Sequence, residues 1–89
     1  MNVNIYSVYD TKAEAFGQPF FMQADGLATR AFIQSTLNPE SEFAKYPNDF
    51  TLYQIGTYDD SNAFLASNKP EELITGAQAL SQAKKENKK

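Results

Sequence analysis

The chain has 89 residues, of which 42% are hydrophobic, and its formal net charge is −3. This length allows one domain, and so small a core makes self-association an expected property. Because the chain contains neither cysteine nor histidine, we exclude disulfides, thiolate metal sites, a cysteine nucleophile and the commonest general base. The N-terminus has no basic segment followed by a long apolar run, so neither a signal peptide nor a membrane span is expected.

The charge is distributed unevenly along the chain. Residues 83–89 hold four lysines and one glutamate, a net charge of 4 − 1 = +3, so the other residues carry −3 − 3 = −6. An acidic body is atypical of proteins that bind duplex DNA, which present a basic face. The basic tail, 83–89, could contact phosphate, but a solvated and disordered end is the simpler interpretation.

Two strands are predicted at the start of the chain. Residues 2–10 carry apolar side chains on both faces, Val3 and Ile5 on one and Tyr6 and Val8 on the other. This pattern is typical of a central strand, or of an edge strand that a partner covers. A polar turn follows at residues 10–14. Pro19 then suits the beginning of a second strand, in which Phe20 and Met22 alternate with Phe21.

A helix is predicted from Asp25 to Asn38. Asp25 would cap its first turn, and Asn38 before Pro39 would end it. One apolar stripe is expected, formed by Leu27, Ala28, Ala31, Phe32 and Leu37. We expect this stripe to pack on the sheet, with Phe32 buried against Leu52 of a later strand.

The middle of the chain is predicted as a loop followed by a second pair of strands. Phe43 and Tyr46 are expected to attach the loop, 38–49, to the core. Residues 50–58 give the clearest strand, with a bulge at Gly56. Asp59 and the three polar residues after it form a turn, and residues 63–66 return as a short fourth strand.

The predicted fold class is α+β. A core domain, 1–67, would hold an antiparallel sheet of three to four strands and one packed helix in the order ββαββ. Residues 67–72 resemble a helix start, with Pro70 near the first position and acids in the first turn, so a C-terminal helix is predicted over 68–82. The basic tail, 83–89, completes the chain.

No motif for catalysis is present. The four glycines are isolated, so no phosphate loop exists, and Asp59 and Asp60 are best explained as turn residues. No enzyme activity, metal or cofactor is expected.

Unpaired nucleic acid could instead stack on aromatic side chains. The candidate stacking residues are Tyr6 and Tyr53, and the candidate phosphate contacts are Arg30, Lys45, Lys84 and Lys85. The alternative is that the aromatic residues form the core or a dimer contact.

Four segments resemble the small nonstructural protein of gokushoviruses, the tailless single-stranded-DNA phages of the Microviridae. They are residues 5–16, 18–21, 28–32 and 47–59, in order and at similar spacing. The resemblance implies a phage protein that is absent from the capsid, acts in the host bacterial cytoplasm and assists DNA replication and single-strand synthesis. It supplies no active-site residues.

Two hypotheses follow for the function. In the first, the protein assists phage DNA replication by binding single-stranded DNA weakly. In the second, it is a homo-oligomeric interaction module that regulates a phage or host replication protein without contacting DNA. Neither hypothesis requires a membrane.

Overall fold

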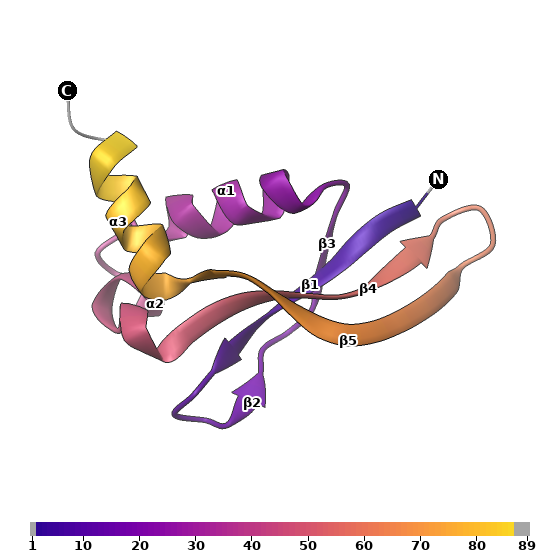
Figure 1. Ribbon diagram of the computed structural model, residues 1–89, viewed down its shortest axis with the longest axis horizontal. Coiled ribbons are helices and arrows are strands. Elements are labelled where there is room, and N and C mark those ends of the chain that lie inside the picture. The colour runs from indigo at the N-terminus through magenta and orange to yellow at the C-terminus, as the bar shows by residue number, and fades with distance from the viewer. Residues whose placement is uncertain (1, 87–89) are drawn as a thin grey trace.

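The computed structural model describes residues 2–86 and has one antiparallel sheet with helices on one side of it (Figure 1). The α+β class predicted from the sequence is confirmed. The strands are β1 (Asn2–Asp10), β2 (Ala15–Phe16), β3 (Phe20–Met22), β4 (Phe50–Asp59) and β5 (Phe64–Thr75). The helices are α1 (Asp25–Ser35), α2 (Glu42–Lys45), the 3-10 turn η1 (Pro47–Asp49) and α3 (Gly76–Glu86).

The sheet is built around β1, which is a central strand, the first of the two arrangements that its two apolar faces predicted. Its order is β2-β1-β4-β5, and β3 pairs with β1 on a separate branch. Every pairing is antiparallel. The register slips between Ile5 and Tyr6 of β1, which leaves Ile55 of β4 without an opposite residue. The bulge predicted at Gly56 therefore lies at the residue before it, and it strengthens the local twist of the sheet.

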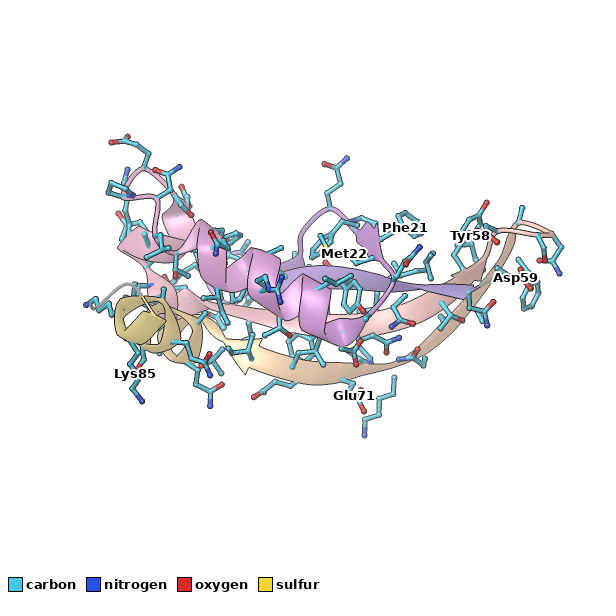
Figure 2. The ribbon with its side chains drawn as sticks, turned by 90° about the horizontal axis from the view of Figure 1, so that it is seen from above. Phe21, Met22, Tyr58, Asp59, Glu71 and Lys85 are labelled. Carbon is cyan, nitrogen blue, oxygen red and sulfur yellow. The ribbon has the colours of Figure 1, made fainter. Side chains whose placement is uncertain are left out.

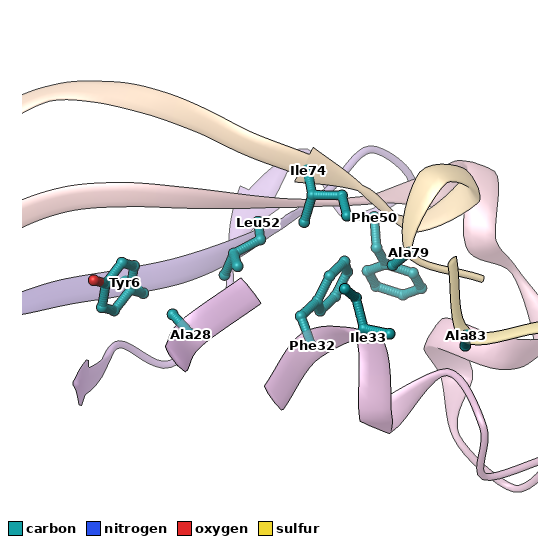
Figure 3. Close-up of a cluster of buried hydrophobic side chains, with 9 residues drawn as sticks. All are labelled: Tyr6, Ala28, Phe32, Ile33, Phe50, Leu52, Ile74, Ala79 and Ala83. Atoms are coloured by element: carbon teal, nitrogen blue, oxygen red, sulfur yellow. The ribbon is translucent and has the colours of Figure 1, made fainter. Parts of the chain in front are cut away.

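The hydrophobic core lies between the sheet and the two longer helices. Phe32 and Ile33 of α1 point toward Phe50 of β4 and Ala79 of α3 (Figure 3). Phe32 and Leu52 are both buried in this cluster, as predicted. The remaining members of the cluster are Tyr6, Ala28, Ile74 and Ala83. Figure 3 shows that all of these side chains lie on the helical side of the sheet.

The segment predicted as a loop over 38–49 contains α2 and η1. Phe43 attaches it to the core, as expected, because its ring lies 5.1 Å from that of Phe32 and 4.8 Å from that of Phe50. Tyr46 does not share this role, since 56% of its surface is exposed.

The predicted helix α1 is present, but two of its details differ. Ala24, not Asp25, occupies the N-cap position, and no side chain caps the helix. The Asp25 carboxylate instead accepts hydrogen bonds from the side chains of Tyr6 and Asn4. The apolar stripe is also narrower than predicted. Ala28, Phe32 and Ile33 are buried, whereas Leu27, Ala31 and Leu37 are exposed.

The C-terminal third differs most from prediction. The residues predicted to start a helix at 67–72 belong to β5, which continues to Thr75, and α3 begins only at Gly76. The predicted order ββαββ and the short fourth strand are therefore wrong. The chain instead forms three strands, then α1, and then a long hairpin of β4 and β5. The predicted basic tail starts inside α3, and its last residues, 87–89, lie outside the described part of the chain.

Candidate functional site: the uncovered face of the sheet

Within residues 2–86, no helix packs on one face of the sheet, and we call it the open face. In a β-ladder, residues that lie directly opposite each other point to the same side. The register therefore places Ile5 with Phe21, Tyr9 with Phe16, Val3 with Tyr58, and Ser7 with Tyr53 on the side opposite the core. The open face includes the apolar and aromatic residues Val3, Ile5, Tyr9, Phe16, Phe21, Tyr53, Ile55, Tyr58 and Leu65, together with Ser7, Thr51, Gly56 and Glu72.

Two aromatic pairs extend across β1 on the open face. At one end, the Phe16 ring lies 5.4 Å from that of Tyr53 and 4.9 Å from that of Tyr9. At the other end, near the β4–β5 hairpin, the rings of Phe21 and Tyr58 are 5.7 Å apart (Figure 2). Both contacts are edge-to-face, a favourable geometry for aromatic side chains. Each pair keeps one strongly exposed ring, since Phe16 is 44% and Phe21 51% exposed.

Two shallow hollows flank the second aromatic pair. One, of about 360 Å³, lies between Ile5, Phe21, Ile55 and Leu65. The other, of about 550 Å³, has Val3, Phe21 and Tyr58 in its wall together with Asp60. Two acidic side chains lie at the open face: Glu72 is directly opposite Tyr53, and Asp60 lines the second hollow. The face is therefore apolar and aromatic, with these two acids beside it.

Tyr6 cannot take the stacking role predicted for it. Its side chain is completely buried on the helical side of the sheet. Its hydroxyl donates to the Asp25 carboxylate at 2.8 Å and accepts from the Asn4 side-chain amide at 3.0 Å. Burial, followed by the hydrogen bond to Asp25, raises the pKa of Tyr6 to about 12. Tyr6 therefore joins the start of α1 to β1 and is unavailable to a ligand.

The predicted phosphate contacts lie away from the aromatic surface. Arg30 lies two residues from both Ala28 and Phe32 in α1, so at 100° per residue it points away from the sheet. Lys84 and Lys85 are exposed on α3, and Figure 2 shows Lys85 far from Phe21 and Tyr58. Lys45 is exposed on α2. Of the six predicted site residues, only Tyr53 lies on the open face.

The sequence analysis missed the four other aromatic residues of the open face, which are Tyr9, Phe16, Phe21 and Tyr58. A signal for Phe21 was present, because it alternates with Phe20 and Met22, which pack against the core. Phe16 and Tyr58 could not be placed without the register of the ladder.

Within residues 2–86, no group of three acidic, histidine or cysteine side chains is arranged to hold a metal ion. No helix in this range is long and apolar enough to cross a membrane.

The fold and the open face define a small α+β domain in which a one-sided antiparallel sheet presents aromatic rings. The chain belongs to a phage protein family, since residues 3–80 match the family described as Phage ORF5 protein. This match confirms the resemblance at the level of a phage protein. Neither the curated proteins nor the solved structures contain a match to the chain.

Proposed function

We propose that this phage protein assists DNA replication and single-strand synthesis by binding unpaired DNA weakly on the open face, without enzymatic activity of its own. The observation that carries the proposal is the placement of two aromatic pairs on the open face. Bases of any sequence can stack on exposed aromatic rings, so such a face needs no sequence motif. The role in replication rests on the resemblance to the gokushovirus nonstructural protein, and the site of action would be the cytoplasm of the host bacterium.

The spacing of the pairs supports contact with more than one nucleotide. Phe16 is opposite Tyr9 and Phe21 is opposite Ile5, which are four residues apart on β1. At a rise of about 3.3 Å per residue, the two platforms are separated by about 13 Å. A strand that reaches both platforms should bind more tightly than a nucleotide that reaches only one.

The charge distribution supports weak binding that depends little on salt. Each phosphate neutralised by a cation adds to the salt dependence of binding, because counterions are released. Arg30, Lys84 and Lys85 lie on the helices, whereas Glu72 lies beside Tyr53 on the open face. Stacking would then provide most of the affinity, and phosphate contacts little of it.

A second candidate function is favoured by the aliphatic part of the same face. The hollow between Ile5, Ile55 and Leu65 is apolar, and Asp60 borders the neighbouring one. A surface with an apolar centre and a charged rim is typical of protein–protein contacts. In this alternative, the chain is an interaction module that engages a replication protein and does not contact DNA.

Fluorescence anisotropy with labelled single-stranded and duplex oligonucleotides, over a series of salt concentrations, tests the proposal. Phe16→Leu and Phe21→Leu keep an apolar side chain but remove the ring, so we expect each to weaken single-strand binding by ~1–3 kcal/mol. Tyr46→Leu is the matched control. Tyr46 is also an exposed aromatic residue, at 56%, but it lies at the end of α2.

Single-strand binding that is lost in the two phenylalanine variants and kept in Tyr46→Leu supports stacking on the open face. The proposal is overturned if duplex binds as tightly as single strands with a steep salt dependence, or if Arg30→Ala abolishes binding while Phe21→Leu does not. Absence of binding to either DNA at low salt also overturns it and leaves the interaction module as the function to test.

A further inference from the structure

The outer edge of β5 is the longest strand edge left unpaired in residues 2–86. β5 spans Phe64–Thr75 and pairs with β4 on one side, and the sheet ends there. In an edge strand, alternate residues direct their backbone N–H and C=O groups outward, where another strand can pair with them. Natural proteins protect such edges with charges, proline, bulges or a covering element.

The two halves of this edge differ in that protection. In the second half, Lys69, Pro70, Glu71 and Glu72 place charges and a proline together, and the register with β4 is irregular there. In the first half, residues 64–67 contain neither a charge nor a proline and pair regularly with β4. Among the described residues, Phe64 and Leu65 have the two most exposed large hydrophobic side chains, at 64% and 62%. Only the first half is therefore open to pairing.

This open half is complementary to itself. If two copies pair antiparallel about a two-fold axis at Ala66, Phe64 lies opposite Asn68 and Leu65 opposite Ser67 of the other copy. The two Leu65 side chains then become diagonal neighbours. Lys69 of each copy reaches the 59–63 turn of the other copy, where Asp59 and Asp60 lie. Opposite charges therefore meet at both ends of the contact, and Pro70 ends the pairing.

Hydrogen bonds within the 59–63 turn hold its conformation. The Ser61 hydroxyl and backbone amide both donate to the Asp59 carboxylate, at 2.6 and 3.0 Å. These two hydrogen bonds lower the pKa of Asp59, so that this carboxylate is ionised at neutral pH. The Ala63 amide closes the turn on the Asp59 carbonyl oxygen at 2.8 Å.

We propose that residues 64–68 of β5 pair with the same segment of a second copy, giving a two-fold dimer with one continuous sheet. The open faces of the two copies then lie on the same side of that sheet and meet at Leu65. Any ligand of the open face would encounter a platform twice as long. The dimer itself does not depend on what that face binds.

Sedimentation over a wide concentration series, with no DNA present, measures this association. Leu65→Lys and Leu65→Glu each bring like charges together across the two-fold axis, so we expect either variant alone to be monomeric. Mixing the two variants in equal amounts should restore a dimer. Leu27→Lys is the control, because Leu27 is 46% exposed on α1, away from the edge. Since Leu65 is exposed, circular dichroism spectra of the variants should match that of the unsubstituted protein.

A single cysteine tests the register. The chain has no cysteine of its own, so Ala66→Cys can form a disulfide only between copies. At the two-fold axis, paired residues have Cα atoms about 4.5–5.5 Å apart, within the range of a disulfide. Ala31→Cys, at an exposed position on α1, is the control and should remain largely uncrosslinked under the same mild oxidation.

A dimer that Leu65→Lys dissociates and Ala66→Cys crosslinks supports the proposal. A protein that stays monomeric at every concentration overturns it, as does a dimer that both charged Leu65 variants leave intact. Because these measurements use no DNA, their result is independent of whether the open face binds single strands.

Discussion

The two faces of the sheet carry similar side chains but have different environments. On the covered face, Phe50 of β4 forms a continuous aromatic contact with Phe43 of α2 and Phe32 of α1, and two of the three are buried. On the open face, Phe16 and Phe21 make contacts of similar length, yet about half of each side chain is exposed. The covered face should therefore determine stability, and the open face should determine binding.

The difference arises from where the chain places its helices. α1 follows β3 directly and α3 follows β5 directly, and both pack on the side that carries Leu52 and Ile74. No described element crosses to the other side. A chain of this length has few residues left to cover a second face, so aromatic side chains on that face remain available to a partner.

The largest effect is expected for Phe32→Ala on the covered face. Phe32 is 4% exposed and its ring contacts Phe43. Removing so large a buried side chain should lower the free energy of unfolding by ~3–5 kcal/mol. A domain of this size has little more than that to lose. Thermal or urea denaturation measures the loss, and Phe21→Ala on the open face is the comparison. Equal losses for both variants would contradict the division between the faces.

The division itself was only partly predictable from the sequence. Alternation in residues 2–10 separated Val3 and Ile5 from Tyr6 and Val8 correctly. It could not tell which of the two sets would meet the helices, because the choice depends on contacts with α1 and β4, far away in the chain. Tyr6 was therefore taken for a stacking residue, although it is completely buried.

The error at β5 has a different cause. Locally, Pro70 followed by Glu71 and Glu72 has every sign of a helix start. The segment is a strand because it pairs with β4 as far as Thr75, opposite Thr51. Proline is tolerated there because β5 is an edge strand, whose outward side needs no hydrogen bond. Pairing with β4 overrode the local preference for a helix. Such long-range pairing cannot be recognised from the sequence of the segment alone.

The Gly56→Ala variant tests whether the part of the open face around Ile5 also contributes to stability. Gly56 lies opposite Ile5 and is buried, and a Cβ added there would overlap the carbonyl oxygen of Ala66. We expect Gly56→Ala to lower the free energy of unfolding by ~1–3 kcal/mol, as overpacking does. Gly26→Ala is the control, because the space around Gly26 in α1 is empty. It should instead stabilise the protein by up to ~1 kcal/mol. Denaturation curves that coincide for the two variants would rule out the predicted overlap.

The buried hydroxyl of Tyr6 gives the covered face a measurable pH dependence. The pKa of Tyr6 is raised from 10.0 to about 12 in the folded protein. Below pH 10 both states keep the proton, so this contribution to stability is fully present. Between pH 10 and about 12 only the unfolded state loses it, so stability should fall by ~1.4 kcal/mol per pH unit. Urea denaturation of the unsubstituted protein and of Tyr6→Phe at each pH isolates the contribution of this hydroxyl. Parallel curves for the two proteins would contradict the role assigned to Tyr6.

The smallest expected effect is the coupling between Phe16 and Tyr53 on the open face. Their rings are 5.4 Å apart at an interplanar angle of 75°, an edge-to-face contact. Such contacts contribute ~0.5–1.5 kcal/mol beyond the burial of area. A double-mutant cycle with Phe16→Leu, Tyr53→Leu and both together should give a coupling within that range, and exposure to solvent favours its lower end. The same three variants, measured by anisotropy with single-stranded DNA, should show larger losses in binding than in stability. If stability falls more than binding does, these two rings belong to the structural part of the sheet and Phe21 with Tyr58 remains as the stacking platform.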